Sequence, residues 1–144
     1  MTKFIGYNIE KPNSIKTVFD VTLNDGQQVS NPIISYLKKQ TLVVVFETHE
    51  LNETNIKAQL YQLDGKLLNS LIVNTNQTSQ QAWPKIKSFT KHKILVITWQ
   101  TLFKAGDLVI TSHTKYRIFD FGLRPLVKIG GGTEQILENR HSKD

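Results

Sequence analysis

The chain has 144 residues, of which 39% are hydrophobic and 21% charged, a composition that fits one globular domain and excludes a disordered chain. It contains no cysteine, so disulfides, thiolate catalysis and cysteine-based zinc sites are excluded together. The formal net charge is +6, and the excess is concentrated in residues 81–128, where nine Lys or Arg stand against two Asp or Glu.

The first half of the chain has the pattern of several short strands. Apolar and polar residues alternate over residues 15–22 and again over 56–60, a period of two that is typical of a β-strand. The run Leu42 to Phe46 is apolar without alternation, which predicts a strand covered on both faces. Asp64-Gly65 follows the 56–60 segment and predicts a type I′ turn in a tight hairpin.

The second half continues the same pattern. Pro84, like Pro32 before it, is expected to begin a strand, where its missing N–H does least damage to the hydrogen-bond ladder. The apolar run Ile94 to Ile97 predicts a second strand covered on both faces. Two more strands are then expected, with turns at Gly106 and at residues 112–114: Asp107 to Ser112 and Tyr116 to Phe121.

The end of the chain changes character at Gly130-Gly131-Gly132. These glycines predict a hinge, followed by a short helix with Thr133 as its N-cap. We therefore divide the chain into a β-repeat domain, residues 1–128, and a Gly-hinged C-terminal tail, residues 129–144. No secretory signal and no apolar segment of the ~20 residues needed to cross a bilayer is visible, and the compartment stays open.

The chain also aligns with itself. Residues 4–34 match residues 56–86 at a shift of 52 without a gap, and after one inserted residue 42–48 match 95–101. Periods of this length indicate stacked supersecondary units. We predict an all-β fold of antiparallel four-stranded units resembling β-propeller blades: a partial blade, a full blade and a degenerate one. Three are too few to close a ring, because propellers need at least four.

The residues that carry this pattern resemble a known family, the repeats of large bacterial and ciliate surface or secreted proteins, whose unit "P-x-I … F-V-V-V-W-Q-S … I-x-G-Q-x-F-D … G … F-x-V-N" forms propeller-like blades. The matching positions are Pro84 and Ile86, Leu95 to Gln100, Ile56 to Tyr61, Gly65, and Ile72 to Asn74. Ala58 stands where the family has glycine. The resemblance implies a binding or adhesion surface, and it carries over no functional residue.

No enzyme motif is present. The sequence lacks the G-x-S-x-G signature, phosphate-binding loops and the dinucleotide-binding glycine pattern. Its four histidines form no metal-binding spacing, and His49 and Glu50 are adjacent, which places them on opposite faces of a strand. We therefore expect a protein that is not an enzyme, with no catalytic residue, no metal and no cofactor.

The strongest candidate site is the basic segment that begins at residue 81. Lysine and arginine attract phosphate, and aromatic rings stack on bases or sugars. Trp83 is expected at the surface, Trp99 in the core, and Lys85 and Lys87 on one exposed strand face. The candidate partner-binding residues are Trp83, Lys85, Lys87, Lys91, His92, Lys93, Arg117 and Arg124. The alternative is a solvated basic surface that binds nothing.

Three functions follow from these observations. The first is a non-enzymatic binding or assembly module, a structural or accessory subunit whose partners are other subunits or copies of itself, because uncovered strand edges need a partner. The second is an RNA-contacting accessory subunit of a ribonucleoprotein, for example an organellar ribosome, acting through residues 81–128. The third is a carbohydrate-binding, lectin-like module in which Trp83 stacks on a sugar ring.

Overall fold

The computed structural model describes residues 2–11, 14–23, 28–75, 79–126 and 134–137, and over these ranges the chain is all-β without a helix. None of these residues therefore forms a helix long and apolar enough to span a membrane. The strands are β1 (Thr2–Lys11), β2 (Ser14–Leu23), β3 (Gln28–Tyr36), β4 (Thr41–Glu50), β5 (Glu53–Gln62), β6 (Leu67–Ile72), β7 (Gln80–Phe89), β8 (Ile94–Ala105), β9 (Leu108–Asp120) and β10 (Glu134–Leu137). The all-β class expected from the sequence is confirmed.

The strands form a hairpin and one larger, open network. β1 and β2 pair with each other as a two-stranded sheet. The other eight are connected in the order β10-β9-β8-β7-β5-β4-β3, with β6 on the side of β5. β5 and β7 are joined by a single parallel pair, Thr54 and Gln80, whereas the other pairs of the network are antiparallel.

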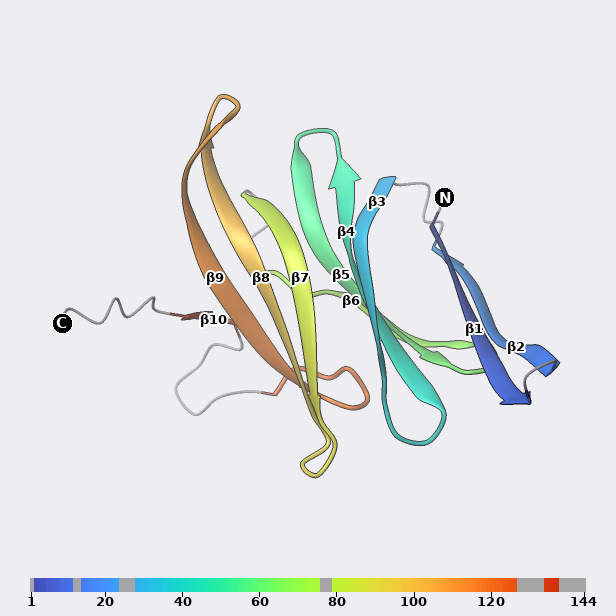
Figure 1. Cartoon of the computed structure of the whole chain (residues 1–144). Coiled ribbons are helices and arrows are strands. Elements are labelled where there is room, and N and C mark those ends of the chain that lie inside the picture. The colour runs from blue at the N-terminus through green and yellow to red at the C-terminus, as the bar shows by residue number, and fades with distance from the viewer. Residues whose placement is uncertain (1, 12–13, 24–27, 76–78, 127–133, 138–144) are drawn as a thin grey trace.

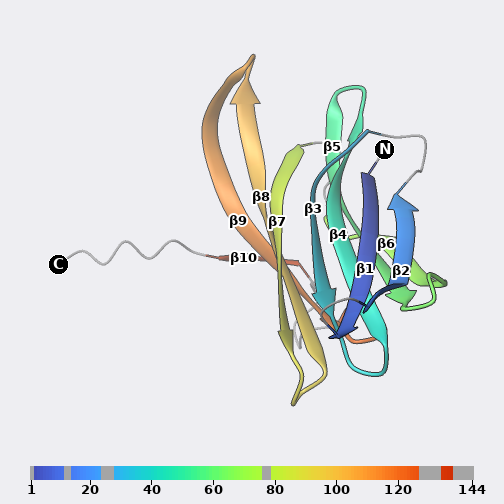
Figure 2. The ribbon, with the colours of Figure 1, turned by 45° about the vertical axis from the view of Figure 1, so that its right-hand side comes forward.

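The single link between β5 and β7 lets the network fold into two sheets that pack on each other. We call β3, β4, β5 and β6 the first sheet, and β7, β8, β9 and β10 the second sheet. Figures 1 and 2 show the second sheet on one side of the first, and the β1–β2 hairpin on its other side. The described chain therefore has three layers, with the first sheet in the middle.

The main apolar core lies between the two sheets. The first sheet contributes Val43, Val45, Ile56 and Ala58, among others, and the second sheet contributes Leu95, Ile97, Trp99 and Phe119. All eight side chains are at most 1% exposed. Because full burial of one large apolar side chain stabilises a fold by ~1.5–3 kcal/mol, this core holds the two sheets together.

A second apolar cluster covers the opposite face of the first sheet. It contains Leu42, Val44, Phe46 and Tyr61, and it lies on the side where Figures 1 and 2 show the β1–β2 hairpin. β4 is thus buried on both faces, as its unbroken apolar run predicts.

The same expectation is wrong for Ile94 to Ile97 in β8. Leu95 and Ile97 are fully buried, but Ile94 and Val96 are only partly buried. Their side chains belong to the face of the second sheet that points away from the first sheet, and no strand layer of the described chain lies on that face.

Both proline-containing strands have the same irregularity. The ladder of β3 with β4 is interrupted between Ser30 and Ile33, and that of β7 with β8 between Ala82 and Lys85. The residue before each proline has a positive φ, 47° at Asn31 and 52° at Trp83. The prolines therefore lie in bulges inside β3 and β7 and do not begin these strands, because a bulge also tolerates a missing N–H.

The turn between β5 and β6 also differs from the expectation. Only Gly65 has a positive φ, 93°, and its N–H donates to the carbonyl of Gln62 at 2.9 Å. The backbone N–H of Gln62 in turn donates to the carbonyl of Lys66 at 2.9 Å. This is a three-residue loop ending in a left-handed glycine, so the hairpin is confirmed while the type I′ turn is wrong.

Two further expectations near the C-terminus are corrected. Residues 112–114 form no turn, because they continue the ladder with β8 through the pairs Leu102–Ser112 and Gln100–Thr114. The predicted helix after Thr133 is a strand, β10, whose residues pair with Thr114 to Arg117 and so satisfy the edge of β9. The predicted N-cap Thr133 and the three glycines before it lie outside the described residues.

Candidate interaction site on the second sheet

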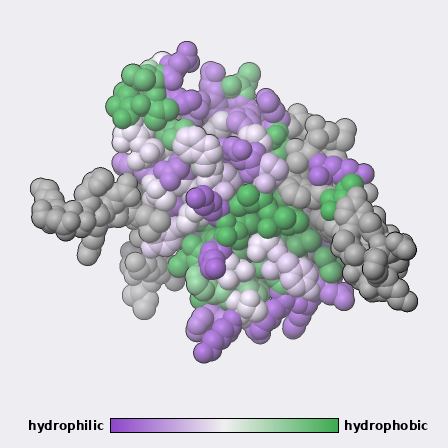
Figure 3. Space-filling view, in the orientation of Figure 1, coloured by the Kyte–Doolittle hydropathy of each residue, from purple (hydrophilic) through white to green (hydrophobic). Residues whose placement is uncertain are grey.

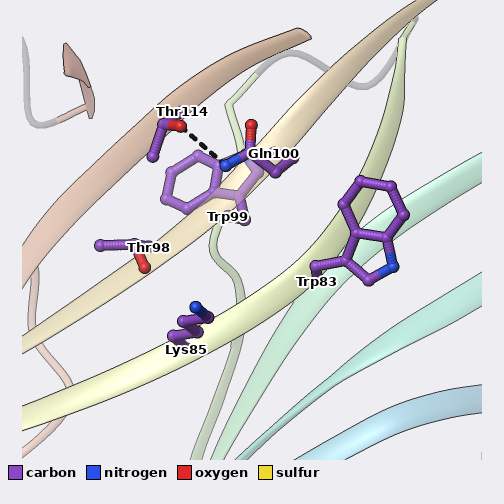
Figure 4. Close-up of a pocket in the computed structure, with 6 residues that line it drawn as sticks. All are labelled: Trp83, Lys85, Thr98, Trp99, Gln100 and Thr114. Carbon is purple, nitrogen blue, oxygen red and sulfur yellow. Dashed lines mark hydrogen bonds between the residues drawn. The ribbon is translucent and has the colours of Figure 1, made fainter. Parts of the chain in front are cut away.

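The outer face of the second sheet, the face turned away from the first sheet, contains a pocket of about 520 Å³. Figure 4 shows that the residues around it come from three neighbouring strands, β7, β8 and β9. They are Trp83, Lys85, Thr98, Trp99, Gln100 and Thr114. Two of them, Trp83 and Lys85, belong to the candidate residues identified from the sequence.

The β7 bulge determines where Trp83 lies. Its backbone N–H donates to Oε1 of Glu47 in the first sheet at 3.1 Å, and its φ of 52° is uncommon for a large side chain. The side chain is 57% exposed, as expected from the sequence. Trp99, in contrast, is 1% exposed, and its indole N–H donates to Oε1 of Gln81 at 2.9 Å. The two tryptophans therefore have different roles, one at the surface and one in the core.

Two polar side chains on one side of the pocket are bonded to each other. Nε2 of Gln100 donates to the hydroxyl of Thr114 at 2.7 Å, across the ladder from β8 to β9. In Figure 4 the amide oxygen of Gln100 points away from Thr114. This leaves the oxygen as a hydrogen-bond acceptor. Lys85 lies opposite Thr98 on β8, and not opposite Gln100.

The outer face of the second sheet corresponds, row by row, to the face of the first sheet that packs against the second sheet. Ser30 pairs with Glu47 on one ladder and Ala82 with Gln100 on the other, and both rows stand beside the bulge. Continuing these rows places Val96 where the first sheet has Val43. Val43 is completely buried, whereas Val96 is partly exposed. The face that is covered in the first sheet is therefore partly open in the second sheet.

The structure brings together only some of the basic candidates. Lys85 and Lys87 both lie exposed on the outer face, opposite Thr98 and Val96. Lys91, His92 and Lys93 are exposed in the turn between β7 and β8. Arg124 follows β9 and is also exposed, with Nε 3.9 Å from Oδ2 of Asp120.

Arg117 lies on the other side of the second sheet. Its Nη1 donates to the carbonyl of Val73 at 3.0 Å, and its guanidinium stands 5.4 Å from the ring centroid of Phe119. Both contacts face the first sheet and the core. Arg117 therefore links the two sheets and does not share a surface with Lys85 and Lys87.

A buried polar group that sequence reasoning missed connects the two sheets. Glu47 is 3% exposed, and its carboxylate accepts hydrogen bonds from Ser30, Asn31 and the N–H of Trp83. Ser30 also contacts Nε2 of His49. The available signal was the carboxylate itself, since Glu47 directly extends the apolar run that ends at Phe46, and a charge there needs buried partners.

An apolar group is exposed at the tip of the β8–β9 hairpin. Figure 3 shows it as the hydrophobic area at the upper left, where Figure 1 places this hairpin. Leu108 and Ile110 are 71% and 66% exposed. Phe103 stacks edge-on against His113, with ring centroids 5.1 Å apart.

The described residues contain no group of three or more His, Asp or Glu placed to hold a metal ion. Comparison with known proteins gives no match to a family model, to a curated protein or to a solved structure.

Proposed function

We propose that the chain is a non-enzymatic binding or assembly module, a structural or accessory subunit of a larger assembly. Its partner contacts the outer face of the second sheet. The observation that carries this proposal is the difference between matched faces: the centre of the face of the first sheet is buried, as at Val43 and Val45, and the second sheet leaves the equivalent residues Val96 and Thr98 partly exposed.

The exposed face has the composition of an interface that is not permanently closed. Val96, Tyr116 and Ile118 provide partly buried apolar surface, and Lys85, Gln100 and Thr114 provide polar groups around it. Interfaces between separately folded proteins combine an apolar centre with a polar rim in this way. The exposed Trp83 adds an aromatic side chain, a residue type that often contributes most of the binding energy.

We further propose that each sheet is a blade-like unit of the kind expected from the sequence repeat. The matching bulges and the matching rows of the two ladders support this interpretation. In such an arrangement each layer covers the face of the layer before it. The second sheet then needs one more layer, which a partner supplies.

The native mass of the chain in an extract of its own cells tests the proposal. We expect it to migrate well above its own 16.5 kDa. Val96→Asp should return it to that mass, because a charge on the outer face opposes apolar contact. Thr111→Asp, on the exposed part of β9, is the matched control and should leave the larger particle intact. Wild-type chain that migrates at its own mass would contradict the proposal.

A second candidate is an anionic partner such as RNA. It is favoured by the exposed Lys85 and Lys87 on the same face as Trp83, with Lys91 and Lys93 in the adjacent turn. Binding of a labelled single-stranded RNA would then weaken linearly in log–log plots against salt concentration. Replacing Lys85 and Lys87 by Gln should reduce the slope by ~0.7 for each lost phosphate contact. An RNA affinity that these substitutions leave unchanged would exclude this surface.

A further inference from the structure

The contact between the two sheets shows how the first sheet receives a neighbouring strand. The hydroxyl of Thr54 accepts a hydrogen bond from the N–H of Gln81 at 2.7 Å and donates one to its carbonyl at 2.9 Å. Two residues further along β7, the N–H of Trp83 donates to Oε1 of Glu47 at 3.1 Å. Alternate residues of β7 thus bond to one hydroxyl and one carbonyl-type oxygen of the first sheet.

The second sheet carries the same pair of groups in the same rows. One row of the first sheet crosses β3, β4 and β5 at Gln28, His49 and Thr54. The equivalent row of the second sheet crosses β7, β8 and β9 at Gln80, Leu102 and Ser112. Glu47 lies opposite Ser30, and Gln100 opposite Ala82. Each position keeps its chemistry, since Ser112 has a hydroxyl in place of that of Thr54 and Gln100 has a side-chain carbonyl in place of the Glu47 carboxylate.

Both groups are accessible. Ser112 is exposed on β9. Gln100 lines the pocket and donates its amide N–H to the hydroxyl of Thr114, and in Figure 4 its oxygen points away from Thr114. In the first sheet the corresponding space is filled by the start of β7. In the second sheet the pocket of about 520 Å³ beside Trp83 is lined by Gln100 and Thr114, and Ser112 lies two residues from Thr114 on β9.

We propose that this pocket is the docking site for the bulged leading strand of a β-sheet in a partner polypeptide. The strand presents two backbone N–H groups two residues apart, the first to Ser112 and the second to Gln100. The apolar face of the partner sheet then covers Val96, Tyr116 and Ile118. This proposal rests on the assembly function proposed above and specifies how the partner is recognised.

The binding mode follows from the continuity of an interface that the chain already contains. Backbone N–H groups give affinity for any extended strand, and the side chains that point at the sheet provide selection. The bulge matters because Trp83 lies in it, and its N–H, two residues after that of Gln81, donates to the acceptor sheet.

The strand that performs this docking within the chain supplies the probe. A fluorescein-labelled peptide of residues 79–87 is titrated into the full chain by fluorescence anisotropy. Three versions are compared: unmodified, N-methylated at the positions of both Gln81 and Trp83, and N-methylated at the position of Ala82. The first modification removes the two proposed donors, and the second blocks an N–H on the opposite edge with the same chemical change.

We expect the unmodified peptide to bind, because its backbone reproduces the contacts of β7. Loss of one hydrogen bond to a neutral acceptor weakens binding by about tenfold, so the doubly methylated peptide should bind about a hundredfold more weakly. Methylation at Ala82 should change the affinity by less than about threefold. Ser112→Ala and Gln100→Ala should each weaken the unmodified peptide about tenfold. Thr111→Ala is the matched control and should leave the affinity unchanged.

Equal binding of the three peptides, or binding that Ser112→Ala and Gln100→Ala leave intact, would overturn the proposal, as would no binding. Sedimentation of the chain alone distinguishes another occupant: a concentration-dependent dimer that Gln100→Ala dissociates would assign the site to a second copy and overturn the assignment to a different polypeptide. A chain that migrates in a larger particle but ignores the peptide would retain the assembly function and lose only the strand-docking site.

Discussion

Loss of the Glu47 side chain should cost the fold more than loss of an exposed polar side chain, because Glu47 connects the bulges of both sheets. Its carboxylate is 3% exposed and accepts hydrogen bonds from Ser30 and Asn31 in the first sheet and from the N–H of Trp83 in the second. Replacing Glu47 by Ala removes the acceptor and leaves these donors behind. We expect the free energy of unfolding to fall for this reason, and not through lost apolar contact.

The size of the effect follows from the three donors. The N–H of Trp83 is fixed by the backbone, so its loss of an acceptor costs about 1–3 kcal/mol. Ser30 and Asn31 lie near the surface and can turn toward water, so each contributes ~0.5–1 kcal/mol. Glu47→Ala should therefore cost about 3 kcal/mol. Glu47→Gln keeps one oxygen as an acceptor and should cost about half of that.

Urea unfolding followed by tryptophan fluorescence, to which the buried Trp99 contributes, measures this prediction. Total stabilities of about 5–15 kcal/mol make a loss of 3 kcal/mol a large shift in midpoint, with the slope unchanged if the transition stays two-state. Glu50→Ala is the matched control, since Glu50 ends the same strand and is exposed. If the free energies of unfolding of the Glu47→Ala and Glu50→Ala variants agree within about 0.5 kcal/mol, the hydrogen bonds of Glu47 do not stabilise the fold as argued.

Two further substitutions test the packing of the sheets. Val43→Ala should lower the free energy of unfolding in urea by about 2 kcal/mol, because it leaves a cavity between the sheets. Val96→Ala should lower it by less than about 1 kcal/mol, because it removes methyl groups from a partly open face. Equal losses would mean that the outer face is covered. Arg117→Ala should cost about 1–2 kcal/mol, because it removes the bond to the Val73 carbonyl and the contact with Phe119, and no change in the unfolding midpoint would contradict its placement between the sheets.

The parts of the fold that sequence predicted are those that depend on local pattern. Alternation in residues 56–60 gave a strand, and the unbroken apolar run Leu42 to Phe46 gave a strand buried on both faces. The exposure of Trp83 followed from its poor fit to the repeat, where the first copy has Asn31. The two strand predictions needed only neighbouring residues along the chain, and the prediction for Trp83 needed the comparison of the two copies.

The parts that sequence could not predict depend on which surface lies opposite. Ile94 to Ile97 is as apolar as Leu42 to Phe46, but only one of its faces meets another sheet, so Val96 is partly exposed. Arg117 is as basic as Lys85, but strand parity places its partly buried guanidinium on the side of the first sheet, where it bonds to Val73. The polar sequence around residues 112–114 suggested a turn, and only the length of β8 shows that it continues a ladder.

The difference between Glu47 and Gln100 follows from what each faces. The Glu47 carboxylate accepts hydrogen bonds from donors of the same chain, so these bonds are present with or without a partner. A carboxylate at position 100 would lose its hydration whenever a partner arrived, and burial of an ion costs several kcal/mol unless the new bonds offset it. The neutral amide of Gln100 loses far less on burial and still offers an oxygen to an incoming N–H. A partner that comes and goes therefore favours the amide, and Gln100→Glu should weaken binding of the 79–87 peptide in the same anisotropy titration, because the carboxylate must lose its hydration.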